Sequence, residues 1–70
     1  MKLTHLYTIP GCGGSNCPSI YETDNGTLAV QGWNLPDGTI ETPAGEGIVE
    51  IPTDLEEEIA RRWARRHGLI

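Results

Sequence analysis

The stretch SIYETDNGTLAVQGW, residues 19–33, decides the fold that the sequence predicts. Two runs rich in β-branched and aromatic residues flank Asn25-Gly26, a pair that tolerates positive φ at both central positions of a type I′ turn. The stretch therefore predicts a β-hairpin with a two-residue loop. In that register four side chains share one sheet face, which we expect to be the core face: Tyr21, Thr23, Leu28 and Val30.

Residues on either side of the hairpin predict two further strands. KLTHLYTI alternates with the period of two that is typical of a strand, and Pro10 ends it. IVEI is a short strand-like run just before Pro52. The segments between are rich in glycine and proline and predict loops, the longer of which has room for a brief edge strand at residues 39–42. The expected strands are residues 2–9, 19–24, 27–33 and 48–51, and the expected loops are residues 10–18 and 34–47.

The C-terminal segment predicts a helix over about residues 54–67. Thr53 and Glu56 match a capping box directly after Pro52, and Gly68 stands where a left-handed residue commonly ends a helix. Apolar residues recur every four positions and predict one stripe that faces the sheet: Leu55, Ile59 and Trp63. Ion pairs at i,i+4 spacing are expected on the solvent side: Glu57 with Arg61 and Glu58 with Arg62.

Together these elements predict an α+β fold in a single domain, residues 1–70. A small antiparallel sheet of three to five strands, built around the central hairpin, would carry one C-terminal helix packed on it. A chain of this size buries roughly 60% of its unfolded surface, so we expect a thin core and no deep active-site cavity. No apolar run has the length of a secretory leader or a membrane span, and we therefore expect a cytoplasmic protein without a membrane partner.

The charge is distributed unevenly along the chain. The formal net charge is -5, yet the arginines are gathered near the C-terminus: Arg61, Arg62, Arg65 and Arg66. An acidic chain repels a phosphate backbone, so direct nucleic-acid binding is disfavoured except through this arginine patch. The patch also suits an acidic protein surface, and the helix dipole explains it without any partner.

The cysteines Cys12 and Cys17 admit three interpretations. In a cytosolic protein we expect free thiols, one of them buried, ahead of a reversible disulfide. The third is a zinc site with His5 and His67 as further ligands, although the second short-spaced ligand pair typical of such sites is missing. We expect no metal and no other cofactor, and replacing both cysteines by serine should leave the fold intact.

No catalytic constellation is apparent in the sequence. The glycine cluster at residues 11–14 lacks the lysine and the following helix of a phosphate-binding loop. The consecutive acids Glu56, Glu57 and Glu58 point in different directions from a helix, and capping and dipole effects account for them. We therefore do not expect an enzyme.

The two tryptophans predict different roles. Trp63 lies on the apolar stripe of the expected helix and is expected in the core. Trp33 follows the hairpin and opens a polar loop, which favours an exposed aromatic anchor of the kind that dominates interfaces.

The segments CPSIY, GTLAVQGW and GIVEIP resemble a pattern found in small uncharacterised actinobacterial proteins. In that pattern Cys-Pro-x-aliphatic-Tyr is followed by a short turn, a Val-Gln-Gly strand end and a Glu-x-Val-x-x-Pro segment ahead of a terminal helix. The resemblance spans about residues 12–56 and implies an accessory or antagonist of a helix-turn-helix transcription regulator. The partner-binding residues that it implies are Cys17, Pro18, Tyr21, Val30, Gln31, Gly32 and Trp33.

The sequence thus predicts a non-catalytic cytosolic protein-interaction module, with a DNA-binding regulator as partner and a homodimer as a compatible state. Two alternatives stay open. One is a small thiol or zinc protein that uses Cys12 and Cys17, and the other is nucleic-acid contact through the C-terminal arginines.

Overall fold

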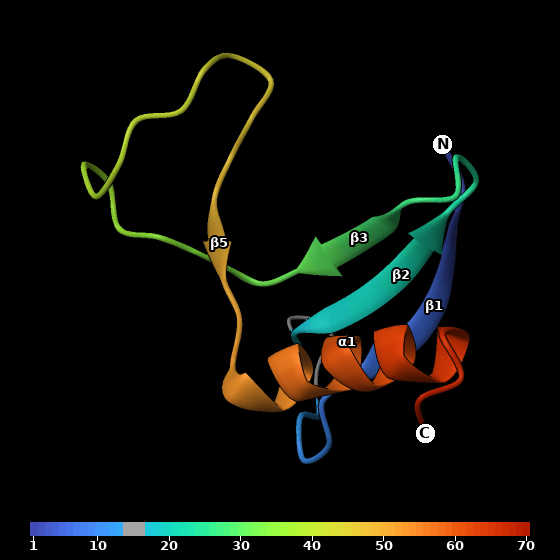
Figure 1. Cartoon of the computed structure of the whole chain (residues 1–70). Coiled ribbons are helices and arrows are strands. Elements are labelled where there is room, and N and C mark those ends of the chain that lie inside the picture. Colours follow the sequence, from blue (N-terminus) through green and yellow to red (C-terminus); the bar gives the residue numbers. More distant parts are fainter. Residues whose placement is uncertain (14–16) are drawn as a thin grey trace.

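The computed structural model describes residues 1–13 and 17–70. It confirms the α+β fold, with a three-stranded antiparallel sheet, a second two-stranded sheet and one C-terminal helix. The first sheet has the order β1-β2-β3, so β1 and β3 are its edges (Figure 1). The elements in chain order are β1 (Leu3–Thr8), β2 (Ser19–Thr23), β3 (Leu28–Gln31), β4 (Trp33–Asn34), β5 (Val49–Glu50) and α1 (Thr53–Arg66).

The hairpin forms where the sequence predicted it, but its loop has three residues instead of two. The Thr23 N–H donates to the Thr27 carbonyl at 2.9 Å, which leaves residues 24–26 as the loop. Gly26 has a φ of +79°, whereas no non-glycine residue of the described chain has a positive φ. This is the geometry of a type I turn closed by a glycine bulge, so the predicted type I′ turn is wrong.

The longer loop shifts the register by one residue and overturns the expected core face. Ile20 now pairs with Val30, and Tyr21 pairs with Ala29. Because side chains alternate across a strand, a one-residue slip places Tyr21 and Thr23 on one face and Leu28 and Val30 on the other.

The Thr23 side chain explains why the chain adopts the longer loop. Its hydroxyl oxygen accepts hydrogen bonds from the backbone N–H groups of Asn25 and Thr27, each at 3.2 Å. It also lies 2.6 Å from the Thr27 hydroxyl. A side chain that satisfies two backbone donors favours this loop over the tighter one.

The core lies between β2 and the helix that crosses it (Figure 1). Ile20 and Leu55 are fully buried, and Cys17 and Pro18 extend the buried region to the start of β2. With so few large buried side chains, the body has the thin core expected from its length.

The helix lies within one residue of the predicted range, although its N-terminus is built differently. Pro52 is the N-cap and no side chain caps the helix, so the predicted capping box of Thr53 and Glu56 is wrong. Thr53 is already inside the first turn, where its hydroxyl is not placed to cap.

The C-terminus of the helix confirms the predicted left-handed glycine. Gly68 has a φ of +71°, its N–H donates to the Arg65 carbonyl at 3.2 Å, and the Leu69 N–H donates to the Ala64 carbonyl at 2.9 Å. These two bonds make a Schellman motif.

Trp63 is not in the core, which corrects the prediction for that residue. It is 56% exposed and stacks on the His67 ring with centroids 4.2 Å apart. A groove lined mostly by polar groups, with Glu22 and the hairpin loop on its far wall, separates the last turns of the helix from the sheet, so the end of the apolar stripe is not packed there.

Residues 33–50, which we call the arm, form an excursion that stands away from the body (Figure 1). Two turns order its loop, with Thr39 N–H donating to the Pro36 carbonyl and Glu46 N–H to the Pro43 carbonyl. No strand forms at residues 39–42. Within the described part of the chain, the one helix is too short and too polar to cross a bilayer.

Candidate interaction surface

The chain exposes more surface than a compact protein of its mass. The accessible surface is 5402 Å² for 7.6 kDa, against about 4,300 Å² for a typical folded monomer of that mass. The radius of gyration is 13.6 Å, against about 11 Å for a compact 70-residue domain. The arm accounts for this shape, because it projects from the body instead of folding onto it.

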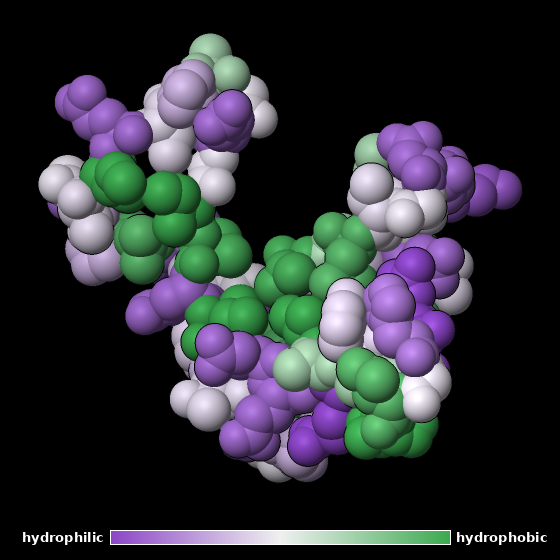
Figure 2. Space-filling model, viewed as in Figure 1, coloured by the Kyte–Doolittle hydropathy of each residue, from purple (hydrophilic) through white to green (hydrophobic). Residues whose placement is uncertain are grey.

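Apolar side chains gather around the hollow between the arm and the body. Figure 2 shows this hollow with apolar surface on its floor and on the arm beside it. The helix covers β2 and leaves the β3 side of the same sheet face open (Figure 1). We give the name β3–arm surface to the exposed apolar residues of β3 and the arm: Leu28, Val30, Trp33, Ile40, Ile48 and Val49. The register of β4 and β5 places Trp33 and Val49 on opposite faces of the arm.

Gly32 fixes the arm to the end of β3. A Cβ atom at this position would collide with the Glu50 carbonyl oxygen and would lie 3.0 Å from Ile51 Cγ2 and 3.1 Å from Val49 Cγ2. Only glycine permits so close an approach of the two backbones, and it allows β4 to pair with β5 immediately afterwards. The glycine that the resemblance singled out therefore has a structural role at the base of the arm.

The outer edge of β3 has open backbone groups at two positions. The Thr27 carbonyl faces β2, and residues that bond a neighbouring strand alternate, so Ala29 also faces β2. The N–H and C=O groups of Leu28 and Val30 therefore point away from β2. Because β3 is an edge of its sheet, no strand of the described chain pairs with that side.

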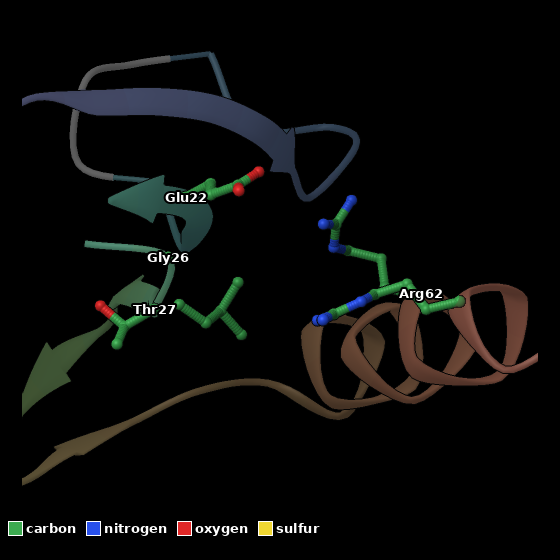
Figure 3. Close-up of a pocket in the computed structure, with 6 residues that line it drawn as sticks. Glu22, Gly26, Thr27 and Arg62 are labelled. Carbon is green, nitrogen blue, oxygen red and sulfur yellow. The ribbon is translucent and has the colours of Figure 1, made fainter. Parts of the chain in front are cut away.

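A polar groove lies at the start of β3, between the hairpin and the last turns of the helix. It has a volume of about 260 Å³, and Leu28 links it to the β3–arm surface. Arg62 reaches from the helix toward the hairpin, with Glu22 on the opposite wall (Figure 3). The full lining is Glu22, Gly26, Thr27, Leu28, Arg62 and Arg66.

The four arginines divide into two pairs with different surroundings. Glu58 forms ion pairs with Arg65 at 2.9 Å and with Arg61 at 3.3 Å, so the predicted i,i+4 pairs are wrong. The hydrogen bond from Arg65, supported by that from Arg61, lowers the pKa of the Glu58 carboxyl, against the opposing effect of burial. Arg62 and Arg66 have no ion-pair partner among the described residues and carry open positive charge into the groove.

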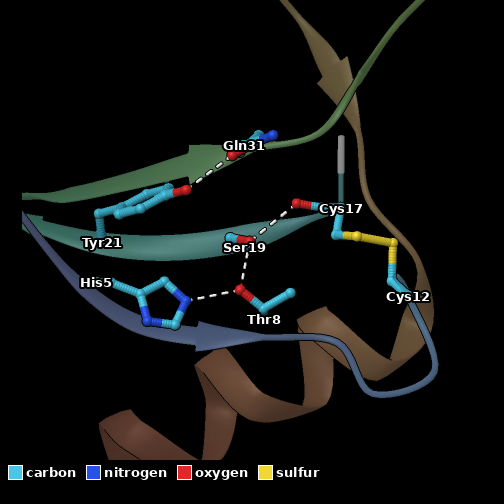
Figure 4. The surroundings of a disulfide bond; sticks show 7 residues. All are labelled: His5, Thr8, Cys12, Cys17, Ser19, Tyr21 and Gln31. Atoms are coloured by element: carbon cyan, nitrogen blue, oxygen red, sulfur yellow. Dashed lines mark hydrogen bonds between the residues drawn. A yellow bond between two sulfur atoms is a disulfide. The ribbon is translucent and has the colours of Figure 1, made fainter. Parts of the chain in front are cut away.

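The cysteines form a disulfide, which corrects the expectation of free thiols. Cys12 and Cys17 are bonded with their Cα atoms 5.9 Å apart, and the bond ties the loop after β1 to the residue before Pro18 (Figure 4). Cys17 is buried, whereas Cys12 is exposed. Bonded cysteines are not thiolate ligands, and no three metal-binding side chains come together in the described ranges. The zinc alternative therefore gains no support.

A chain of hydroxyl groups runs across the sheet face opposite the helix (Figure 4). The buried Ser19 hydroxyl donates to the Cys17 carbonyl at 2.9 Å, so it must accept from Thr8 at 2.8 Å. Thr8 then accepts from His5 Nε2, which lies 2.6 Å away. With His5 as the donor, the three side chains form one continuous hydrogen-bonded network along the edge of the sheet.

The residues implied by the resemblance fall into three groups. Cys17 and Pro18 are buried, so direct contact with a partner is not supported for them. The half-buried Tyr21 donates its phenolic proton to Gln31 Oε1 at 2.8 Å (Figure 4), on the face opposite the hollow. Among the remaining residues Trp33 and Val30 are exposed on the β3–arm surface, where the sequence placed an interface anchor.

Sequence reasoning missed most of this surface. Ile48 and Val49 were assigned to a plain strand, and the groove pair Arg62 and Arg66 was not separated from Arg61 and Arg65. The signal present in the sequence is the arm itself, which carries four acidic residues and no basic one: Asp37, Glu41, Glu46 and Glu50.

No family model matches the chain, and no curated protein or solved structure shows significant similarity to it.

Proposed function

We propose that this protein is a non-catalytic protein-interaction module whose contact surface is the β3–arm surface. The observation that carries the proposal is the large, partly apolar surface around the hollow, on a chain that exposes about a quarter more area than a compact monomer. Exposed apolar patches of this kind mark interaction sites in soluble proteins. The resemblance adds a helix-turn-helix regulator as the partner to test first.

The alternatives have weaker support from the described residues. A redox role for Cys12 and Cys17 rests on one disulfide whose buried member is held inside the fold. Nucleic-acid contact would rest on two open arginines in a chain of net charge -5.

The cytoplasmic location stays a proposal, and the disulfide bears on it directly. Such bonds persist in oxidising compartments and are rare in the reducing cytosol. Alkylating the protein rapidly in its host, followed by mass spectrometry, measures the fraction in which Cys12 and Cys17 are bonded. A fully alkylated pair agrees with the proposed location, and a fully bonded pair contradicts it.

The two tryptophans allow a matched pair of substitutions that tests the contact surface. Trp33 is 46% exposed on the arm and Trp63 is 56% exposed on the far part of the helix. The immobilised protein is exposed to host extract, and the retained proteins are identified. We expect Trp33→Ala to lose the retained partner and Trp63→Ala to keep it, since exposed aromatic anchors at interfaces commonly contribute about 2 kcal/mol or more.

Circular dichroism of both variants must match the parent for the comparison to count. Loss of binding with Trp63→Ala and normal binding with Trp33→Ala would move the contact surface to the helix and its arginines. A purified regulator that binds neither the parent nor either variant would remove the partner that the resemblance implies.

A further inference from the structure

We propose that the partner seated on the β3–arm surface is a second copy of this chain, joined through antiparallel pairing of the two β3 edges. The inference rests on the proposed function and names a second copy, in place of the regulator that the resemblance implies, as the occupant of that surface. It follows from the open backbone groups of β3, from the face on which its apolar side chains lie, and from the charges at the two ends of that strand.

The backbone of β3 is an unprotected edge. Its residues, LAVQ, include no proline and no charged side chain, which are the usual guards of an exposed strand. The open groups belong to Leu28 and Val30, with Ala29 between them. If Ala29 lies on the two-fold axis, Leu28 of each copy exchanges both backbone hydrogen bonds with Val30 of the other. The two three-stranded sheets then form one continuous sheet.

The side chains on this edge suit the same symmetry. Leu28 and Val30 project from the helix-covered face, and a two-fold axis perpendicular to the sheet keeps both copies' side chains on that face. Four exposed apolar side chains then meet across the axis and cover one another. The interface is self-complementary, as a closed two-fold dimer requires.

The charges at the two ends of β3 are complementary in this arrangement. The groove with Arg62 and Arg66 lies at the start of the strand, whereas the arm leaves from its end. Antiparallel pairing brings the start of each β3 beside the end of the other. The acidic arm of one copy, which has no lysine or arginine, is thereby directed toward the arginine groove of its partner.

The available area is sufficient for a stable dimer. The chain exposes 5402 Å², about 1,100 Å² beyond a compact monomer of its mass. A standard interface covers about 800 Å² of each partner. The chain therefore has surface to spare for an interface of that size.

Sedimentation velocity of the full chain across the micromolar range tests the inference. We expect a species of twice the 7.6 kDa chain mass at the upper concentrations. Added salt should weaken it, because charge pairs at the ends contribute to its association. A chain that stays monomeric throughout would overturn the inference and leave the proposed function to the retention experiment above.

Two proline variants test the two edges of the sheet independently. Val30→Pro removes an outward N–H on β3 without breaking the ladder to β2, and proline is tolerated at such edge positions. Leu3→Pro likewise removes an outward N–H on β1. The Asp24 N–H donates to the Lys2 carbonyl, so Lys2 faces β2 and the backbone N–H and C=O of Leu3 point away from β2. We expect Val30→Pro to raise the dissociation constant at least about tenfold and Leu3→Pro to leave it unchanged.

A charge swap tests the contact between the arm and the groove. All four substituted residues lie outside β3. One variant carries Arg62→Glu and Arg66→Glu, and the other carries Glu41→Lys and Glu46→Lys. Each alone should dimerise at least about tenfold more weakly, because the first sets an acidic groove against the acidic arm and the second removes the net negative charge of the arm. Their mixture should restore a dimer that contains one copy of each. A mixture no stronger than its components would contradict the proposed placement of the arm.

Discussion

The two edges of the three-stranded sheet differ in how they meet solvent. β1 has a bulge between His5 and Tyr7, and the chain around it is fastened by the disulfide and by the hydrogen bonds of His5 and Thr8. β3 has neither a bulge nor a polar network along its outer side, and its exposed residues include Leu28 and Val30. One edge is protected against strand addition and the other is open.

The two edges differ in how readily each could accept a further strand. A bulge twists an edge strand and removes its flat pairing template, whereas a regular apolar edge is a liability unless something covers it. The protein combines both kinds of edge in one small sheet.

The largest expected effect is on stability, and it tests whether the open edge contributes to the core as the central strand does. Ile20 lies in the central strand and is fully buried, so Ile20→Ala should lower the free energy of unfolding by about 2–5 kcal/mol. Val30→Ala on the open edge should cost less than about 1 kcal/mol under dilute conditions, because its side chain is already exposed. Urea titration measures both. Equal losses would mean that the β3 edge is part of the core.

The next largest effect is the contribution of the disulfide beside β1 to stability. The disulfide links residues only five apart in sequence, and closing so small a loop is expected to contribute about 2 kcal/mol. Cys12→Ser with Cys17→Ser should therefore keep the fold, as predicted from the sequence, but lower the thermal midpoint by roughly 8–16 °C. Reduction of the parent should produce a similar shift. A parent midpoint that ignores reductant would show that the thiols are free.

A smaller effect tests the loop that leads to the open edge. Gly26→Val should cost at least about 1 kcal/mol, because a β-branched residue is strained at the observed positive φ. Asn25 has a negative φ in the three-residue loop, so Asn25→Val should cost appreciably less. A two-residue type I′ turn would require positive φ at both positions and would make the two variants equally harmful. Thermal melts of the pair decide between the loops.

The smallest effect is the pH dependence that comes from Glu58. Its folded pKa is lowered from the ordinary value of 4.5, so its stabilising contribution is complete above that value and is lost as the pH falls through the folded pKa. Glu58→Gln should therefore be less stable than the parent near neutral pH, by about 0.5 kcal/mol, because its arginine partners are exposed. The difference should vanish in acid. A difference that persists at low pH would point to packing instead of charge.

The sequence predicted elements better than it predicted their faces. The hairpin position, the helix and its left-handed Gly68 followed from local chemistry, which acts within a few residues. The register did not, because Asp24-Asn25-Gly26 permits either loop length, and the choice depends on the hydroxyl of Thr23. The loop is one residue longer than predicted, and this places the side chains of β3 on the opposite face of the sheet relative to β2.

The candidate site was predicted only in part, for a related reason. Trp33 was recognised because it follows a strand and opens a polar loop, which is a local pattern. The placement of Arg62 and Arg66 depends on where the helix crosses the sheet, and so does the exposure of Trp63. Such tertiary relations are not encoded in periodicity alone.

The junction at Gly32 has a consequence for the exchange of amide hydrogens. The arm leaves the body at Gly32, and the two-residue pairing of β4 with β5 closes the arm at its base, apart from the ladder between β1 and β2. Amides of the arm should then exchange through local opening at a low free energy, while those of β2 exchange through global unfolding. Occupation of the hollow would slow exchange in the arm selectively, so that the exchange rates record whether the surface is filled.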